Sequence, residues 1–173
     1  MDNCSRFFRY GDPRSDRFFF DLPPEWWSRP YEYLWASQFV DANQVVLDAA
    51  SGICHPFKFY LLDHSRAVEA CDIDDRIVMP TELLKDVAAT FGEDAARTLD
   101  SRYVENIGFS KASLTLLPYK DDTFDRVFCI SVLEHLNDAY NRMAEAMGHS
   151  DAWKSSATRY LPGVGRAQES PET

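Results

Sequence analysis

From residue 45 onward, short apolar runs alternate with segments in which apolar residues recur every third or fourth position. Residues 45–47 form a continuous run of Val, Val and Leu, which is typical of a strand buried on both faces. Similar runs predict strands at residues 67–71, 114–116 and 127–132, and helical spacing predicts helices at 57–61, 83–91, 93–104 and 137–147. Strands that alternate with helices predict an α/β domain with a parallel sheet and right-handed crossovers.

The first forty residues have a different pattern, rich in aromatic side chains and interrupted by proline. Pro23, Pro24 and Pro30 exclude one continuous helix, so this segment is expected to wrap irregularly, with a helix only over residues 31–40. The chain thus divides into an aromatic cover segment with a helix at 1–40, a sheet domain at 41–147, and a divergent tail at 148–173 that is expected to be disordered.

The composition of the 173-residue chain limits the classes of protein that it can be. Apolar residues make up 45% and charged residues 27%, as in a globular domain large enough to bury its own core. The net charge of −10 argues against a nonspecific nucleic-acid binder. No apolar run approaches the roughly 20 residues of a membrane helix, and charged residues interrupt the N-terminus where a signal peptide would lie. We therefore expect a cytoplasmic protein that binds neither nucleic acid nor membranes.

Two carboxylates mark the ends of the first two predicted strands. Asp48 leads into a tight turn of small residues around Gly52, and Asp72 ends the second apolar run, 24 positions after Asp48. A small-residue loop followed by an acid after the next strand is how an α/β sheet holds an adenosine-containing ligand. Two plainer explanations stay open: the loop could be a structural turn, and Asp72 could belong to an acidic helix N-terminus.

Together with two later segments, these residues resemble the class I S-adenosylmethionine-dependent methyltransferases. The later segments are residues 117–127, with Leu-Pro-Tyr followed by Phe-Asp-Arg-Val, and residues 129–136, which end in Leu-Glu-His-Leu. The resemblance covers residues 30–147 and implies a Rossmann-like parallel sheet with flanking helices, S-adenosylmethionine as cofactor, and methyl transfer as the reaction. It also implies further strands after residue 147, which the sequence does not show. The domain is therefore expected to be incomplete at its C-terminal side, as in a truncated or frame-shifted chain.

The resemblance implies that the loop after the first strand binds the methionine part of the cofactor. Ala50, Gly52 and Cys54 occupy the three positions that are commonly glycine, where close backbone approach is needed. Cys54 is the largest of them and would narrow the site. Asp48 would stabilise the loop by accepting its backbone N–H groups.

The resemblance implies that residues at the ends of the next two strands bind the adenosine part of the cofactor. Asp72 would accept hydrogen bonds from both ribose hydroxyls. Ser113 stands where many relatives place an acid next to the adenine amino group, and Leu114 would pack on the adenine ring. The complete set of cofactor-binding residues implied by the resemblance is Asp48, Ala50, Ser51, Gly52, Asp72, Ile73, Ser113, Leu114 and Ile130.

Catalytic and acceptor-binding residues follow from chemistry and position. His135 is the candidate general base for a hydroxyl or amine acceptor, although a histidine in this Leu-Glu-His-Leu block more often packs and hydrogen-bonds in a structural role. Trp27, Tyr31 and Trp35 would line the acceptor pocket, or these rings would only cover the sheet. The acidic, aromatic chain favours a small-molecule acceptor. No metal site is expected, because His55 and Cys54 have no second ligand pair at usable spacing.

Two other functions compete with a methyltransferase. A nicotinamide-dependent dehydrogenase also uses a small-residue loop and a distal acid, but residues 50–55 do not supply its GxGxxG pattern. A degenerate, non-catalytic methyltransferase-like module would fit the substitutions in the loop and the divergent tail. Without later strands, residues 127–132 would also form an apolar sheet edge, through which the chain could self-associate.

Overall fold

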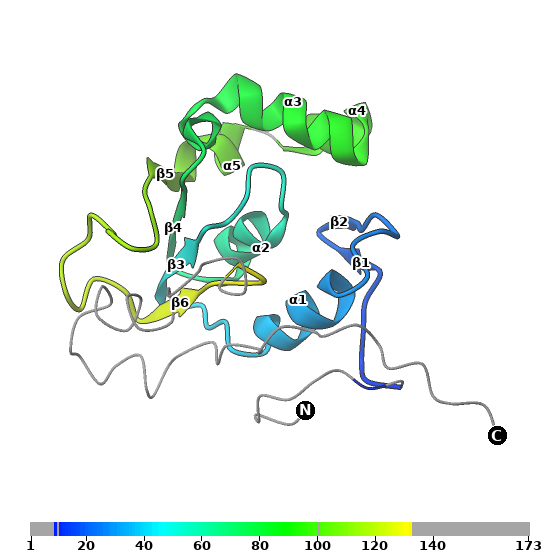
Figure 1. Ribbon diagram of the computed structural model, residues 1–173, viewed down its shortest axis with the longest axis horizontal. Helices are drawn as coiled ribbons and strands as arrows, with labels where there is room; N and C mark the ends of the chain where they lie inside the picture. Colours follow the sequence, from blue (N-terminus) through cyan, green and yellow to red (C-terminus); the bar gives the residue numbers. More distant parts are fainter. Residues whose placement is uncertain (1–8, 10, 100, 133–173) are drawn as a thin grey trace.

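The computed structural model describes residues 9, 11–99 and 101–132 of the chain. Its centre is a four-stranded parallel sheet in the order β5-β4-β3-β6 (Figure 1). The strands are β3 (Val45–Ala49), β4 (Ala67–Asp72), β5 (Ile107–Lys111) and β6 (Arg126–Phe128). Neighbouring strands pair in parallel, so all four end at the same edge of the sheet. This arrangement confirms the α/β, Rossmann-like sheet that the sequence predicts.

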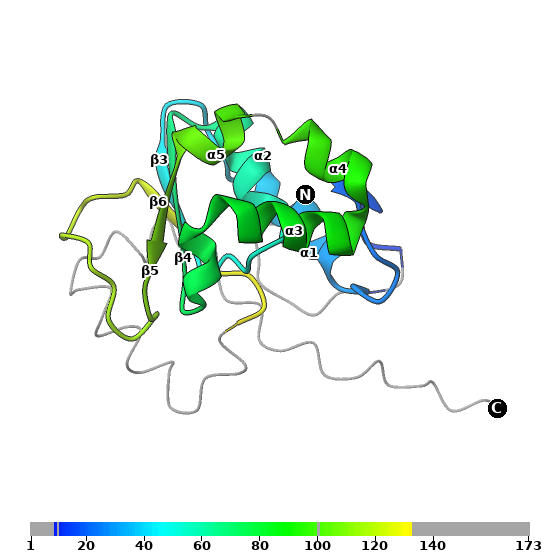
Figure 2. The same cartoon turned by 90° about the horizontal axis from the view of Figure 1, so that it is seen from above.

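Helices α1 to α5 lie on one side of this sheet in both views, while the segment that joins β5 to β6 loops out on the other (Figures 1 and 2). The helices are α1 (Arg29–Ser37), α2 (Phe57–His64), the 3₁₀ helix η1 (Asp75–Val78), α3 (Pro80–Phe91), α4 (Glu93–Thr98) and α5 (Ser101–Asn106). Pro30 lies in the first turn of α1, where the missing N–H has no cost, so the helix begins earlier than residue 31.

Side chains of the central strands alternate between two apolar clusters. Val46 and Phe128 belong to the larger cluster, which includes residues of α2 and α3, and Leu47 and Ala49 belong to a smaller one. By the same alternation, Asp48 projects to the side of the helices. This direction places its carboxylate among the residues of α1 and α2.

The N-terminal aromatic segment is part of the core and does more than cover it. Strands β1 (Arg17–Phe18) and β2 (Phe20–Asp21) pair in antiparallel register around Phe19, whose φ is 61°. Phe18 and Phe20 are both buried in the larger cluster. The two rings therefore tie residues 17–21 to the sheet domain.

The predicted third strand at residues 114–116 is wrong, and β5 takes its place. Residues 113–116 instead form a turn, in which the Leu116 N–H donates to Ser113 O (2.9 Å). Leu114 is buried in the smaller cluster with Leu47 and Cys71, on the face opposite the helices. Its apolar character reflects this packing and not a strand.

Two further elements differ in length from the prediction. The helix expected over residues 93–104 is divided into α4 and α5. The fourth strand, expected to reach Val132, ends at Phe128, and Ser131 has a φ of 52°, which extended backbone does not adopt. The predicted helix at 137–147 and the tail at 148–173 lie outside the described residues. Within the described ranges, no helix is long and apolar enough to cross a membrane.

Candidate active site at the strand ends

Two hydrogen bonds join the loop after β3 to the end of β4. The Ser51 N–H donates to Cys71 O (2.9 Å), and the Gly52 N–H donates to Asp72 Oδ2 (2.9 Å). The other oxygen of Asp72 accepts a hydrogen bond from the Asp74 N–H (3.0 Å). The small-residue loop and the distal acid therefore lie side by side at the carboxyl edge of the sheet.

Gly52 is required by both backbone conformation and space. Its φ of +64° lies in the left-handed region, and a Cβ there would lie 2.4 Å from His55 Cδ2. Ala50 also has a positive φ, 54°, so the turn is tight on both sides of Ser51. The imidazole ring of His55 thus occupies the space that the glycine leaves.

Lys58 of α2 binds the carbonyl groups of this loop, a role that the sequence did not predict. Its side chain is fully buried, and its Nζ donates to Gly52 O (2.8 Å) and His55 O (2.7 Å). Burial lowers the pKa of Lys58 to about 8, against the opposing pull of Asp48. The position of Lys58 between Phe57 and Phe59, in an apolar stretch, was the one feature of the sequence that indicated its burial.

Asp48 is buried, and one of its two carboxylate oxygens has no hydrogen-bond partner among the described residues. The residue is 3% exposed, and this oxygen is Oδ2. Burial raises the pKa of Asp48 to about 7, while the positive charges of Lys58 and Arg29 oppose that rise. The expectation that Asp48 accepts the loop's N–H groups is not met for Ser51 and Gly52, which donate elsewhere.

An aromatic group from the N-terminal segment encloses His55. Trp26 stacks on the imidazole with ring centroids 4.3 Å apart, and Tyr33 Oη and His55 Nδ1 are hydrogen-bonded at 2.7 Å. Burial lowers the pKa of His55 to about 3, with Arg29 and Lys58 acting in the same direction. His55 is therefore neutral at physiological pH and fixed from two sides.

Helix α1 reaches the end of β6 through a buried carboxylate. Glu32, 3% exposed, forms an ion pair with Arg29 and accepts a hydrogen bond from Ser131 Oγ. The guanidinium of Arg29 also lies over the Tyr33 ring, 6.0 Å from its centroid. Ser131 is three residues beyond β6, so α1 and two strand ends contribute to one cluster.

The residues predicted to contact the adenosine differ in how accessible they are. Ile73 is 70% exposed directly after Asp72, whereas Leu114 is only 6% exposed. The Ser113 hydroxyl bonds to Thr115 Oγ1 (2.9 Å) within its own turn. Leu116, which was predicted to lie in a strand, is 79% exposed in the turn that follows β5.

The three predicted acceptor-lining residues lie on or just before α1. Trp27 is 55% exposed just before α1. Tyr31 lies beneath the Arg14 guanidinium, and Trp35 packs edge-to-face on Phe39. Because Arg126, the first residue of β6, lies over Phe39, the Trp35 side chain lies toward the amino ends of the strands. The partly buried Ile130 packs against the larger cluster, and His135 lies outside the described residues.

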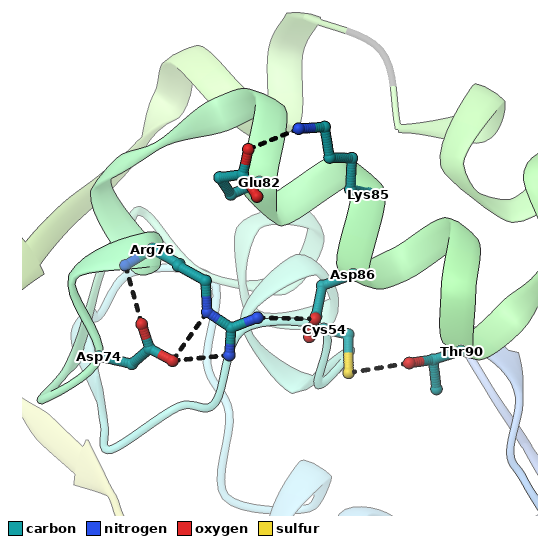
Figure 3. Close-up of polar contacts among 7 residues, drawn as sticks. All are labelled: Cys54, Asp74, Arg76, Glu82, Lys85, Asp86 and Thr90. Atoms are coloured by element: carbon teal, nitrogen blue, oxygen red, sulfur yellow. Dashed lines mark hydrogen bonds and ion pairs between the residues drawn. The ribbon is translucent and has the colours of Figure 1, made fainter.

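Cys54 points away from the strand ends and toward α3. Figure 3 shows Thr90 of α3 donating to Cys54 Sγ (3.4 Å). In the same view, Arg76 of η1 bridges Asp74 and Asp86 (Nη1 to Asp86 Oδ1, 3.1 Å). The expected narrowing of the site by Cys54 therefore does not occur, because its side chain fixes the loop to α3.

Comparison with known proteins identifies the domain. The family described as "Methyltransferase domain" matches residues 47–149, more than half of the chain. The chain belongs to this family. The match confirms the resemblance inferred from the sequence, together with S-adenosylmethionine as the cofactor of the domain, and it decides against the dehydrogenase. No group of three or more His, Cys, Asp or Glu side chains that could hold a metal ion occurs among the residues with a described placement.

Several solved structures are similar to this methyltransferase domain, and the three described below come from bacteria, while no curated protein matches it. The YcgJ protein of Bacillus subtilis is 20% identical over 64% of this chain and 42% of its own, with a TM-score of 0.46. A putative methyltransferase of Bacillus halodurans is 21% identical over 66% and 44%, with a TM-score of 0.47. A SAM-dependent methyltransferase of Aquifex aeolicus is 18% identical over 69% and 59%, with a TM-score of 0.48. The chain spans less than two thirds of each of these structures.

Proposed function

We propose that this chain binds S-adenosylmethionine at the carboxyl ends of β3 and β4 and transfers its methyl group to a small-molecule acceptor. The observation that carries the proposal is the buried Oδ2 of Asp48, which has no hydrogen-bond partner among the described residues and lies beside a loop that is bonded to Asp72. Buried polar atoms without a partner are rare in proteins, so each needs an explanation, and a bound ligand that supplies the missing partner is one. The family of the domain supplies the identity of that ligand.

The adenosine half of the cofactor fits the end of β4. Each oxygen of the Asp72 carboxylate accepts one backbone N–H, which leaves further lone pairs for the two ribose hydroxyls. Ile73 and Leu116 present exposed apolar surface for a flat base. The Ser113 hydroxyl, bonded to Thr115 Oγ1, can donate to Thr115 and still accept a hydrogen bond from the adenine amino group.

The methionine half fits the loop after β3. The sulfonium and the ammonium of this half are cationic, and Asp48 offers a carboxylate oxygen with no other partner in the described chain. Lys58 does not compete for that oxygen, because its Nζ donates to the carbonyls of Gly52 and His55. Small residues at 50 and 52 let the ligand approach the backbone.

The reaction asks little of the protein beyond alignment. S-adenosylmethionine supplies a methyl group that its sulfonium already activates. The chain's residues would hold the acceptor nucleophile in line with that methyl group and exclude water. His135 is the residue we propose as proton acceptor for the nucleophile.

The proposed acceptor is small and carries little negative charge. A chain of net charge −10 disfavours polyanionic substrates such as nucleic acid. Trp27 and Tyr31 stay the proposed acceptor contacts, with exposed Trp27 the one best placed to meet solvent. Trp35 is no longer proposed, because its side chain lies toward the amino ends of the strands and the cofactor would bind at their carboxyl ends.

Titration calorimetry with the purified full chain tests the proposal. We expect S-adenosylmethionine and S-adenosylhomocysteine to bind, and NAD not to bind at the same concentrations. Binding of NAD in preference to both would overturn the assignment. Binding of S-adenosylmethionine without methyl transfer to any of a panel of small amines, phenols and thiols would favour the alternative function, a non-catalytic binding module.

A further inference from the structure

Lys58 carries a buried ammonium group that neither the adenosine nor the methyl chemistry uses directly. Its side chain is fully buried in the first turn of α2, where Nζ lies 5.1 Å from the centroid of the Phe59 ring. Taking a cation out of water is costly, and an apolar side chain of similar length would fill the same space without that cost. The presence of a charge here therefore has to be explained by the groups that it binds.

Three backbone carbonyls of the loop after β3 surround this ammonium group. Nζ donates to Gly52 O (2.8 Å) and His55 O (2.7 Å), and at longer range to Ser51 O (3.5 Å). An ammonium group has three N–H donors and no acceptor, so the loop supplies one carbonyl for each donor. Lys58 thus compensates its burial entirely through the loop on which the proposed cofactor rests.

Gly52 is held at both of its backbone polar groups. Lys58 binds its carbonyl, and Asp72 accepts its N–H (2.9 Å). The peptide that joins Ser51 to Gly52 also lies between these two side chains, since its oxygen faces Lys58 and its N–H faces Asp72. The C=O and N–H of a trans peptide point in opposite directions, so the cation and the anion lie at the two ends of the peptide dipole where each is favourable.

Resting on the proposed function, we propose that Lys58 is a positioning residue for cofactor binding, which holds the loop so that Gly52 fixes the Asp72 carboxylate for the ribose. Because its side chain is fully buried, Lys58 acts through Gly52 and Asp72 and makes no contact with the ligand itself. A carboxylate that is oriented before binding leaves less ordering for the ligand to impose. The effect of Lys58 on affinity therefore depends on the presence of Asp72.

A double-mutant cycle with S-adenosylhomocysteine tests this dependence. Titration calorimetry of the full chain compares the wild type, Lys58→Met, Asp72→Ala and the double variant. We expect Lys58→Met to weaken binding about tenfold in the wild-type chain and less than about twofold in the Asp72→Ala chain, a coupling of the usual size for neighbouring residues. Lys58→Gln keeps two N–H donors for the carbonyls and should retain most of the wild-type affinity.

Exchange of the Gly52 amide proton, followed by NMR without ligand, reports on the hydrogen bond to Asp72 itself. Lys58→Met and Asp72→Ala should each speed this exchange, and Lys58→Gln should speed it less. Lys85→Met is the matched control, because Lys85 is exposed on α3 and pairs with Glu82 (2.6 Å) one turn away. It should change neither the exchange nor the affinity.

An equal loss of affinity from Lys58→Met in both chains, or no loss in either, would overturn the inference and leave the proposed function standing. If urea unfolding shows that Lys58→Met does not fold, the same cycle with Lys58→Gln decides, and its smaller loss should again disappear in the Asp72→Ala chain. A wild-type chain that does not bind S-adenosylhomocysteine would overturn the proposed function itself, and this inference with it.

Discussion

The backbone N–H of Gly52 donates to the carboxylate of Asp72 across 2.9 Å, from the loop after β3 to the last residue of β4. This bond joins the two sequence features, the small-residue loop and the distal acid, that indicate an adenosine-containing ligand. Because β3 and β4 are parallel neighbours, their carboxyl ends lie side by side, and the loop after β3 meets the last residue of β4.

Replacing Gly52 by Ala should destabilise the fold strongly. The new Cβ would have a positive φ and lie 2.4 Å from the His55 ring, so we expect a loss of about 2–4 kcal/mol in urea unfolding. Gly92→Ala is the control, since Gly92 has φ +93° with nothing within 4 Å of its Cβ position. In a His55→Ala background, the cost of Gly52→Ala should fall toward that of Gly92→Ala. An unchanged cost in that background would show that His55 is not the obstacle.

His55 should contribute to acid sensitivity. Its pKa is about 3 in the folded chain and near 6.5 when unfolded, so the unfolded state binds the proton first. The stability from its neutral form is complete above about pH 6.5 and is lost as pH falls toward 3. In unfolding measured from pH 7 to pH 4, His55→Gln should therefore lose stability less steeply than the wild type. Parallel slopes would contradict the burial of His55 as a neutral ring.

Binding of S-adenosylhomocysteine should release protons near neutral pH. The raised pKa of Asp48, about 7, leaves part of the population protonated, and the ligand's ammonium group favours the charged carboxylate. Affinity should rise from pH 6 to pH 8. Calorimetry in two buffers of different ionisation enthalpy measures the released protons, and Asp48→Asn should abolish most of the release. A release that persists in Asp48→Asn would assign it to another group.

Self-association through β6 stays a prediction, and the structure changes its expected strength. Residues 127–132 were expected to form the edge, but β6 ends at Phe128 and has three residues. A short edge offers few N–H and C=O groups for pairing with a second chain. Any dimer should therefore be weak and dissociate on dilution in size-exclusion chromatography with light scattering. A tight dimer at micromolar concentration would point to a different interface.

The sequence predicted β3 and β4 well because β3 begins with a continuous apolar run, β4 is apolar except for Glu69, and each carries a carboxylate at or next to its last residue. It missed β5 because Gly108 interrupts that strand. The structure explains the glycine: a Cβ at Gly108 would lie 2.1 Å from the carboxylate of Glu69, its partner on β4. The strand therefore pairs a charged side chain with a glycine, and its apolar alternation is limited to Ile107 and Phe109, which is too short to stand out in the sequence.

The supporting residues of the site were harder to predict than Gly52 and Asp72. Lys58 reads as an ordinary surface lysine until the fold buries it under the loop carbonyls. Glu32 and Ser131 are 99 residues apart, and their contact depends on how α1 packs against the end of β6. Such tertiary pairs leave no local pattern in the chain.

The central claim is that Asp72 binds the ribose of an adenosyl cofactor, and titration of Asp72→Ala with S-adenosylhomocysteine tests it most directly. The expected loss is about 1.5–3 kcal/mol of binding free energy, which is roughly ten- to hundredfold in affinity. Asp72→Asn, which keeps an acceptor for the Gly52 N–H, checks that the loop is intact. The control is Asp75→Ala, because Asp75 is exposed and its ion pair with Lys111 spans 3.6 Å. The account predicts that both Asp72 variants lose affinity and that Asp75→Ala keeps it; wild-type affinity in folded Asp72→Ala would contradict the account.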